Sequence, residues 1–413
     1  MYPITKRAIK ADTFGSIAVE GVFDVPKDPI GAIAFTVGQK VYVDGSNEPQ
    51  TTATGNKLLG KAVLPAAADA DNVRVRLSQY LKECSPLALL GTRWSQRYRA
   101  TLGHANELRA LLSHLGYLPH GRGYRHADRK VVFVGDFVDR GPSIGEVVKI
   151  AREMVDAGDA LAVMGNHEYN AIAFHTPRPR KHDEWFRPHS EKNLKQHQAT
   201  LDQFSPGELA DAIAWFKTLP VAIEIGGIRV AHASRQTRDI DCINDALVDA
   251  GRFTPDFLAM SEDSGSDLNN AIENVLKGPE LQMPDGHSIV DKAGHQRDSV
   301  RIKWYEDGTG RTYRQHHLGS DEVPDVEIAT GDLDTVDIYP RDAVPVFVGH
   351  YWLTGTPKPL AANVACTDYS VAKAGKLVAY RWNGEATLST EAFYRMEANS
   401  VKFVTLSMNL RLW

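Results

Sequence analysis

The fold of this 413-residue chain is decided by two stretches, VVFVGDFVDRGP at residues 131–142 and LAVMGNHE at residues 161–168. Each is a short apolar run that ends in a glycine and continues into polar residues. Runs that are apolar throughout are typical of parallel strands buried on both faces. Because residues 147–154 between them have helical spacing, the sequence predicts a strand–helix–strand unit and a layered α/β domain.

Further predicted elements flank this unit. Leucines at helical spacing predict a helix over residues 105–115, with Gly116 as its stop. β-type runs at residues 221–231, 344–348 and 376–382 extend the sheet structure, and residues 175–220 are polar and helical in character. Residues 235–340 are rich in aspartate and glycine and weakly patterned, so we expect an elaborated insertion or lid there.

Polar side chains follow four of the predicted strands. Ligands bind outside the carboxyl ends of strands in open α/β sheets, so we expect these side chains to meet at one sheet edge. Gly135 and Gly165 allow the tight turns that aim them inward. The side chains are those of Asp136, Asp139 and Arg140 after the first run, Asn166 and His167 after the second, and His232 and His350 after two later runs.

Four of these residues have the donor atoms of a transition-metal site. Asp136, Asn166, His232 and His350 offer a carboxylate oxygen, an amide oxygen and two imidazole nitrogens. That mixture suits a divalent Mn, Fe or Zn ion. One histidine after a strand is more often structural, but four such residues after four strands predict a metal site.

The composition excludes several classes of protein. With 43% hydrophobic residues, 24% charged residues and a net charge of −5, the chain has the balance of an ordinary globular protein and lacks the basic excess of a broad nucleic-acid surface. No stretch approaches the ~20 apolar residues of a membrane span, and the start, MYPITKRAIKADTF, has no secretory apolar region. Cys84, Cys242 and Cys366 are too few and too far apart for a disulfide framework. We therefore expect a soluble, cytoplasmic protein without membrane association.

Residues 1–78 differ from the rest of the chain. Short β-branched runs alternate with turn signals and contain no histidine, which predicts a small, non-catalytic, all-β barrel or sandwich. The wording GSIAVEGVFDVPKD, GQKVYVDGSN, TATGNKLLGKAV and VRVRL resembles that of phage capsid cement (decoration) proteins over residues 15–78. This resemblance implies contact with a phage capsid, and a generic small β-domain is the alternative. Residues 79–103 form an unpatterned junction before a domain at residues 104–400.

Over residues 104–395 the chain resembles the calcineurin-like metallophosphoesterases, in the branch of the serine/threonine protein phosphatases and the bacterial diadenosine-tetraphosphatase-like enzymes. The resemblance rests on GDFVDRG, GNHE, AHA and FVGH, and on the tail FVGHYWLTGTPKP and CTDYSVAKAGKLVAYRWNGE. It implies a β-sandwich flanked by helices, with two divalent metal ions at the sheet edge. The implied substrates are phosphate monoesters or nucleotide phosphoanhydrides, as in a phosphoprotein or a dinucleoside polyphosphate.

The resemblance also implies a role for each residue after the strands. Asp136 bridges the two metals, and Asn166, His232 and His350 complete the second one. The chemistry agrees, because a metal-bound water has a pKa lowered toward neutrality and paired metals stabilise attacking and leaving oxygens.

The remaining implied roles concern the leaving group and the phosphate. His167 is the general acid, oriented by Asp139, and Arg140 clamps the phosphate. A protonated histidine on a carboxylate can donate to a departing alkoxide, and a guanidinium offers a bidentate fork to phosphate oxygens. Hydrolysis of a phosphate ester fits all of these parts.

The sequence departs from the family at the first metal motif, Gly-Asp-x-His-Gly. Aligned on Gly103, the stretch YRATLGHANEL at residues 98–108 has Ala100 in place of the aspartate and Leu102 in place of the histidine. We expect that the first strand is lost with the motif, that the first metal site is weak or empty, and that turnover is reduced or lost. His104 could substitute as a ligand, but a solvated surface histidine is the favoured interpretation.

Three functions remain open. The leading one is a metal-dependent phosphoesterase. The second is a structural, capsid-associated or binding protein with a vestigial phosphatase domain, and the third is a non-functional fusion product.

Other residues carry less weight. We expect the histidines at 175, 182, 189 and 197 to be solvated or to face substrate, and His316 and His317 to lie on a loop surface. The aromatic pairs at 304–305 and 351–352 are predicted to be core, and Cys366 to be a small buried hydrophobe.

Overall fold

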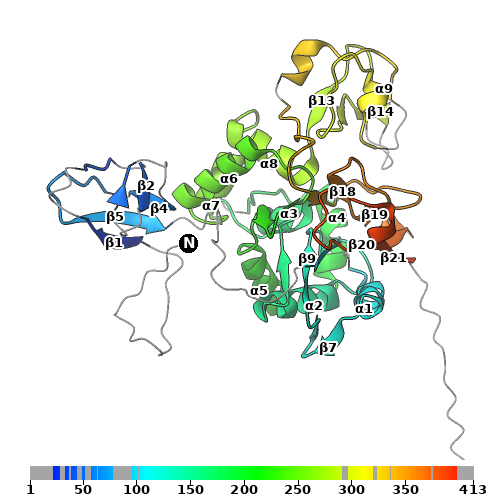
Figure 1. Ribbon diagram of the computed structural model, residues 1–413, viewed down its shortest axis with the longest axis horizontal. Coiled ribbons are helices and arrows are strands. Elements are labelled where there is room, and N and C mark those ends of the chain that lie inside the picture. Colours follow the sequence, from blue (N-terminus) through cyan, green and yellow to red (C-terminus); the bar gives the residue numbers. More distant parts are fainter. Residues whose placement is uncertain are drawn as a thin grey trace, which may run out of the picture. The chain divides into compact units, whose positions relative to one another are not determined.

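The computed structural model divides the chain into two compact units, residues 1–90 and 91–413 (Figure 1). It describes residues 22–27, 33–36, 39–43, 49–51, 57–62, 64–77, 95–99, 103–179, 181, 183–290, 296–319, 323–334, 336–373 and 375–397. Each unit has a core of its own. They are therefore described one at a time.

The first unit contains an antiparallel five-stranded sheet in the order β1-β5-β4-β2-β3. Its strands are β1 (Val22–Pro26), β2 (Lys40–Val43), β3 (Pro49–Gln50), β4 (Lys57–Ala62) and β5 (Asn72–Leu77). Val41, Val73 and Val75 are fully buried and pack with Phe35 in a small core. The described strands agree with the β-branched runs of the sequence, while closure into a barrel stays a prediction.

The second unit begins with a parallel sheet in the order β10-β9-β6. Strand β9 (Arg129–Phe133), helix α2 (Ile144–Asp156) and strand β10 (Ala160–Ala162) form the predicted strand–helix–strand unit. The expected loss of the first strand is wrong, because β6 (Ser95–Arg99) pairs in parallel with the whole length of β9. Strand β9 is thus an inner strand, and the region expected to be an unpatterned junction supplies its partner.

A second, four-stranded sheet has the order β11-β12-β17-β18. Strands β12 (Ile228–Ala231), β17 (Val346–Val348) and β18 (Val364–Cys366) are parallel, and β11 (Ala222–Ile225) is antiparallel to β12. The single run expected at residues 221–231 is therefore a hairpin. Its turn is Gly226-Gly227, where φ is +60° and +86°, a conformation that favours glycine. An antiparallel sheet of β19 (Asp368–Tyr369), β20 (Lys376–Tyr380) and β21 (Phe393–Glu397) completes the unit.

Strand β9 shows how the layers are arranged. Side chains alternate between the two faces of a strand. Val131 and Phe133 pack in the helical core, whereas Val132 and Val134 pack with Phe347 and other side chains of the second sheet. The two sheets therefore share one core, and helices cover the other face of the first sheet. These helices include α1 (Ala105–His114), α2, α3 (Asn166–Phe174) and α5 (Pro206–Phe216). The mixed α/β layering expected from the sequence is confirmed.

The expected insertion at residues 235–340 consists of two different parts. Helices α6 (Thr237–Ala250), α7 (Pro255–Ser261) and α8 (Asp267–Lys277) pack into the main helical core. The following part has a separate small core that includes Leu281, Val300 and Tyr313. It contains β13 (Glu280–Gln282), β14 (Ile289–Val290), β15 (Gln296–Arg297), β16 (Ser299–Arg301) and α9 (Tyr313–His316). Trp304 and Tyr305 belong to the core on the second sheet, as predicted.

No described helix is both long enough and apolar enough to cross a membrane.

Candidate active site

The loops after β9 and β10 meet at a pair of glycines. A Cβ atom on Gly135 would lie 2.4 Å from the Gly165 nitrogen, and one on Gly165 would lie 2.5 Å from the Asp136 nitrogen and from its Oδ1. Such distances do not occur between real side chains and backbone, so both positions require glycine. Asp136 and Asp139 themselves have φ of +59° and +71°, a strained conformation typical of functional sites.

A buried carboxylate that the sequence analysis did not single out holds these loops together. Glu168 accepts hydrogen bonds from the backbone N–H groups of Asp136 at 2.8 Å, Phe137 at 2.7 Å and Gly165 at 3.0 Å. Burial, followed by the charge of Asp136, raises the pKa of Glu168 to about 7. The signal was its position three residues after Gly165, which is the spacing of a capping box at the start of α3.

The four residues expected to bind metal are brought together at this sheet edge. Ligand atoms of Asp136, His232 and His350 all lie within 4.8 Å of one another. Asn166 Oδ1 lies 3.1 Å from His232 Nε2 and 3.0 Å from His350 Nδ1. His232 Nε2 is also 3.2 Å from Asp136 Oδ1.

The hydrogen bonds around this cluster fit a cation. His232 Nδ1 lies 2.5 Å from the Val134 carbonyl and donates to it, so Nε2 is the nitrogen that faces the oxygens of Asp136 and Asn166. Burial, Arg301 and His232 hold the pKa of His350 well below its usual value, which leaves a neutral imidazole. The buried Nε2 of His350 has no hydrogen-bond partner. Oxygen and neutral nitrogen donors that converge in this way suit Mn, Fe or Zn.

His232 responds to the nearby carboxylate. Burial alone would lower its pKa, but the charge of Asp136 and the hydrogen bonds to Asp136 and Val134 raise it. A bound cation would displace the proton from His232 Nε2 and would compensate the negative charge of the buried Asp136 carboxylate.

Beside the cluster lies a buried histidine–carboxylate pair. His167 Nδ1 is 2.7 Å from Asp139 Oδ2, and the side chains are 5% and 2% exposed. Burial opposes the charged form of each, but Asp136 and the bond to Asp139 raise the pKa of His167 to about 9. The hydrogen bonds from His167 and His197 hold the pKa of Asp139 well below its usual value. His167 is therefore protonated at neutral pH and can act as an acid.

Arg140 lies over an aromatic ring in the same region. Its Cζ is 4.0 Å from the ring centroid of Trp352, and Lys373 Nζ is 4.7 Å from that centroid. Cations close to an indole are stabilised by the ring quadrupole. Trp352 was expected to be core, but it is half-buried and contacts both cations, whereas Tyr351 is buried as predicted.

A cleft of about 1140 Å³ contains both groups of residues. Asp136, Asp139, Arg140, Asn166, His167 and His350 line it together with residues of α3, α4 (Glu191–Leu201), α8 and the β16 region. The lining has eight lysines and arginines and five carboxylates. The basic residues are Arg140, Arg187, Lys192, Lys195, Lys277, Arg297, Arg301 and Lys373. His232 is fully buried beneath this surface.

The predicted first-metal region is only partly described. Ala100 and Leu102 lie outside the described residues. Gly103 accepts a hydrogen bond from the Ser143 N–H at 2.9 Å, which places it beside the loop that carries Arg140. His104 is half-buried and its Nδ1 lies 3.5 Å from Glu107 Oε2 at the start of α1. It is not among the described residues whose ligand atoms cluster with Asp136.

Several minor expectations about histidines are wrong. His197 is 4% exposed and is therefore not solvated, His175 and His189 are half-buried, and His182 lies outside the described residues. His316 is 1% exposed on α9, because its ring packs beside Gly308 and Leu333. Cys366 is fully buried, as predicted, and burial raises the pKa of its thiol.

Comparison with known proteins confirms both resemblances. Residues 101–350, more than half of the chain, match the model of the calcineurin-like phosphoesterase family, and residues 2–77 match that of the phage cement proteins. The asymmetrical bis(5'-nucleosyl)-tetraphosphatase PrpE of Halalkalibacterium halodurans is 33% identical over 118 residues, 28% of this chain and 45% of that protein. Its namesake in Oceanobacillus iheyensis is 41% identical over 66 residues, 16% of this chain and 26% of that protein. The chain thus spans less than half the length of either relative.

A solved structure is similar at the level of the backbone. The cold-active protein-tyrosine phosphatase of a psychrophilic Shewanella species is 16% identical, with a TM-score of 0.43. The match covers 87% of this chain and 98% of that one.

Proposed function

The chain belongs to the calcineurin-like phosphoesterase family, and we propose that it hydrolyses phosphate monoesters or nucleotide phosphoanhydrides with a metal-activated water. One observation carries the proposal: two imidazoles, an amide oxygen and a carboxylate converge beside the buried pair of His167 and Asp139. An ion site next to a protonated acid, at the edge of a basic cleft, is what phosphoester hydrolysis requires.

Asp136, Asn166, His232 and His350 hold the divalent ion in this proposal. A bound Mn, Fe or Zn ion supplies a water of lowered pKa and positive charge for the phosphate oxygens. The chain itself orients the ligands, since the Val134 carbonyl fixes the tautomer of His232 and Glu168 fixes the backbone of Asp136.

His167 is the proposed general acid. Its Nδ1–H is held by Asp139, so Nε2 is the atom that can give a proton to the leaving oxygen. Arg140 binds the phosphate, and the contact with Trp352 holds its guanidinium at the cleft wall. The partners of this site are therefore phosphorylated molecules.

Only one complete set of metal ligands is proposed. Ala100 and Leu102 have no donor atoms where the family pattern has an aspartate and a histidine, so the first metal of the family lacks two of its ligands. We expect turnover to be reduced and to need higher metal concentrations. The pairing of β6 with β9 supports an intact fold around this half-site.

The charge of the cleft supports substrates with more than one negative group. Eight basic residues against five carboxylates give its lining a net positive charge, although the whole chain carries −5. A dinucleoside polyphosphate fits this cleft, and the names of the curated relatives support that class. A phosphoprotein with acidic flanking residues is the alternative substrate.

A structural function is the second candidate. The match of residues 2–77 to phage cement proteins favours attachment to a phage capsid. In this function the second unit is a vestigial phosphatase domain. Co-sedimentation of the full chain with phage particles tests this function. A chain that remains in the supernatant and shows turnover contradicts it.

The experiment for the leading function compares the full chain with Asp136→Asn and His167→Ala. With Mn²⁺ present, we expect hydrolysis of an alkyl phosphate by the parent and at least a hundredfold loss in His167→Ala, because general acid catalysis contributes roughly 10²–10⁴-fold. We expect a comparable loss in Asp136→Asn, which removes a charged ligand of the metal ion. Activity that is unchanged in both variants would overturn the proposal.

A further inference from the structure

The carboxylate of Asp139 has a second imidazole partner besides His167. His197 Nδ1 lies 2.5 Å from Asp139 Oδ1, on the side opposite the His167 contact at Oδ2. The His197 side chain is 5% exposed and comes from α4, which is far from Asp139 along the chain. Thr200, one turn later on α4, accepts from the Asp139 N–H at 2.8 Å and donates to Oδ1 at 3.0 Å.

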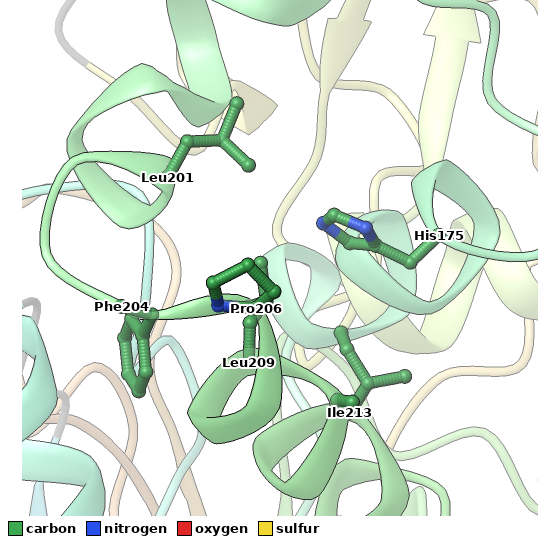
Figure 2. Close-up of a pocket in the computed structure, with 7 residues that line it drawn as sticks. His175, Leu201, Phe204, Pro206, Leu209 and Ile213 are labelled. Carbon is green, nitrogen blue, oxygen red and sulfur yellow. The ribbon is translucent and has the colours of Figure 1, made fainter.

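A third histidine extends the line of hydrogen bonds. His175 Nε2 lies 3.0 Å from His197 Nε2, and His175 follows the last residue of α3, the helix that carries His167 in its first turn. Figure 2 shows the ring of His175 in the wall of a cavity of about 510 Å³, facing Leu201, Pro206 and Ile213. The line therefore runs from the active-site acid through Asp139 and His197 to the wall of a second, mainly apolar cavity.

The protonation of this line follows from its geometry. A carboxylate can only accept, so His197 and His167 each carry a proton on Nδ1 where they face Asp139. The 3.0 Å contact between the Nε2 atoms of His197 and His175 pairs one N–H donor with one acceptor. Burial lowers the pKa of His175 to about 4, so its imidazole is neutral.

Aromatic side chains surround His197 and His175, the two outer histidines of this line. His189 stacks between Phe174 and Trp185, with ring centroids 3.9 Å from each, and its Nε2 donates to the Phe174 carbonyl at 2.9 Å. Phe174 also contacts the rings of His175 and His197 at 5.1 Å and 4.9 Å. Aromatic packing therefore restricts the rotamers of both outer histidines.

We propose that His197, supported by His175, is a positioning residue for the general acid, because it fixes the Asp139 carboxylate that orients His167. This inference rests on the proposed phosphoesterase function. Asp139 has two oxygens, and a carboxylate bound only through Oδ2 could rotate about χ2. Because His197 and Thr200 both donate to Oδ1, that rotation would break two hydrogen bonds. Oδ2 is therefore held in one position, where it accepts the Nδ1–H of His167.

Positioning fits the geometry better than proton conduction. Conduction along the line would require Asp139 to carry a proton and His167 to release its Nδ1–H, whereas the acid donates from Nε2. A carboxylate held below its usual pKa by two N–H donors resists that protonation. His167 gives and regains its Nε2 proton on the side of the cleft, so the proposed role needs no proton transfer through His197 or His175.

The test compares leaving groups. His197→Leu removes the donor, His197→Asn keeps an amide N–H near the position of Nδ1, and His126→Asn removes a half-buried histidine that packs on Tyr117 away from the cleft. A misplaced acid matters most when the leaving oxygen is a poor one. We therefore expect His197→Leu to lower kcat by roughly 10- to 100-fold on an alkyl phosphate, and by less than about threefold on 4-nitrophenyl phosphate, with KM unchanged.

The expected pattern also includes partial recovery in His197→Asn and parental kinetics in His126→Asn. An equal loss on both substrates, or a loss that follows a lowered melting temperature and is not recovered by asparagine, would overturn the proposal and leave His197 a merely structural residue.

A second readout does not depend on activity. Imidazole N–H protons bonded to a carboxylate resonate far downfield, so ¹⁵N-labelled parent should show two such resonances, from His167 and His197. In His197→Leu one is lost and that of His167 shifts and exchanges faster with water. An unshifted His167 resonance contradicts positioning. A parent with both resonances and no turnover refutes the phosphoesterase function but not the positioning of His167.

Discussion

Glu168 Oε2 accepts the backbone N–H of Asp136 at 2.8 Å, across two loops that are 32 residues apart in the chain. The same carboxylate accepts two further N–H groups, so a single buried side chain fixes both loops of the candidate site. Its place at the start of α3 links the geometry of the metal ligands to the capping of a helix.

Replacing this carboxylate should cost more stability than replacing a similar one at the surface. In Glu168→Gln one acceptor oxygen becomes an N–H₂ group that faces backbone donors, which should lower the free energy of unfolding by roughly 1–3 kcal/mol and weaken Mn²⁺ binding. Glu208→Gln is the matched control, because Glu208 caps α5 in the same way but is exposed. Chemical denaturation measures the free energy of unfolding of both variants. Equal losses would show that the buried contacts of Glu168 with the Asp136 loop are not the cause.

The glycine after β10 should not tolerate even one methyl group. A Cβ at Gly165 would meet the nitrogen and Oδ1 of Asp136 at 2.5 Å, so Gly165→Ala must displace Asp136. We expect a loss of stability of about 1–3 kcal/mol and a metal affinity reduced at least tenfold. In contrast, Gly207→Ala on α5 meets nothing within 4 Å and should be neutral or stabilise by up to about 1 kcal/mol. Calorimetric metal titration of both variants measures the affinity, and parental binding by Gly165→Ala would contradict the geometry.

The stacking of Arg140 on Trp352 should appear in substrate binding. Without the indole, the guanidinium of Arg140 loses a contact that holds it 4.0 Å from the ring. A cation–π contact contributes about 0.5–2 kcal/mol, so Trp352→Leu should raise KM roughly 2- to 30-fold with a smaller change in kcat. Trp352→Phe keeps a ring and should lie between. Identical KM values for all three proteins would show that the stack does not assist phosphate binding.

His316 should contribute stability that rises with pH between about 4 and 6.5. Burial, with the charges of Arg311 and Lys303, lowers the pKa of His316 to about 4, whereas an unfolded histidine titrates near 6.5. In that window the unfolded chain binds the additional proton, so the free energy of unfolding increases as pH rises and is lost as pH falls. His316→Gln should reduce this slope. Urea denaturation at several pH values checks it, and an unchanged slope would exclude His316 as a cause.

Much of the site could be predicted because strand ends constrain where side chains lie. Asp136 and Asn166 follow parallel strands of the first sheet, and His232 and His350 follow parallel strands of the second, so strand assignment predicts each pair. The packing of the two sheets, which brings the pairs together, does not follow from the strand assignment. Glu168 was not singled out, and His197 was expected to be solvated or to face substrate, for a different reason. Both act through contacts made by helices packed against the strand ends, and the distance along the chain gives no sign of such contacts.

The strands and helices were also predictable only in part. The apolar run Val131-Val132-Phe133 of β9 indicates a strand, because these three side chains are fully buried. Strand β6 has the polar sequence SQRYR and is recognisable only through its partner β9. Helices α6–α8 lie in an aspartate-rich stretch, but they carry apolar residues at helical spacing, such as Ile240, Ile243 and Leu247 in α6. This pattern was overlooked in the sequence.

The central claim is that one complete set of metal ligands supports phosphoester hydrolysis. Its most direct measurement is the Mn²⁺ dependence of aryl phosphate hydrolysis by the parent, by Asp136→Asn and by the double variant Ala100→Asp/Leu102→His. We predict slow turnover by the parent at high Mn²⁺, none by Asp136→Asn, and faster turnover at lower Mn²⁺ by the double variant. Turnover that is independent of Mn²⁺ or unaffected by Asp136→Asn would contradict the claim, as would silence of both the parent and the double variant.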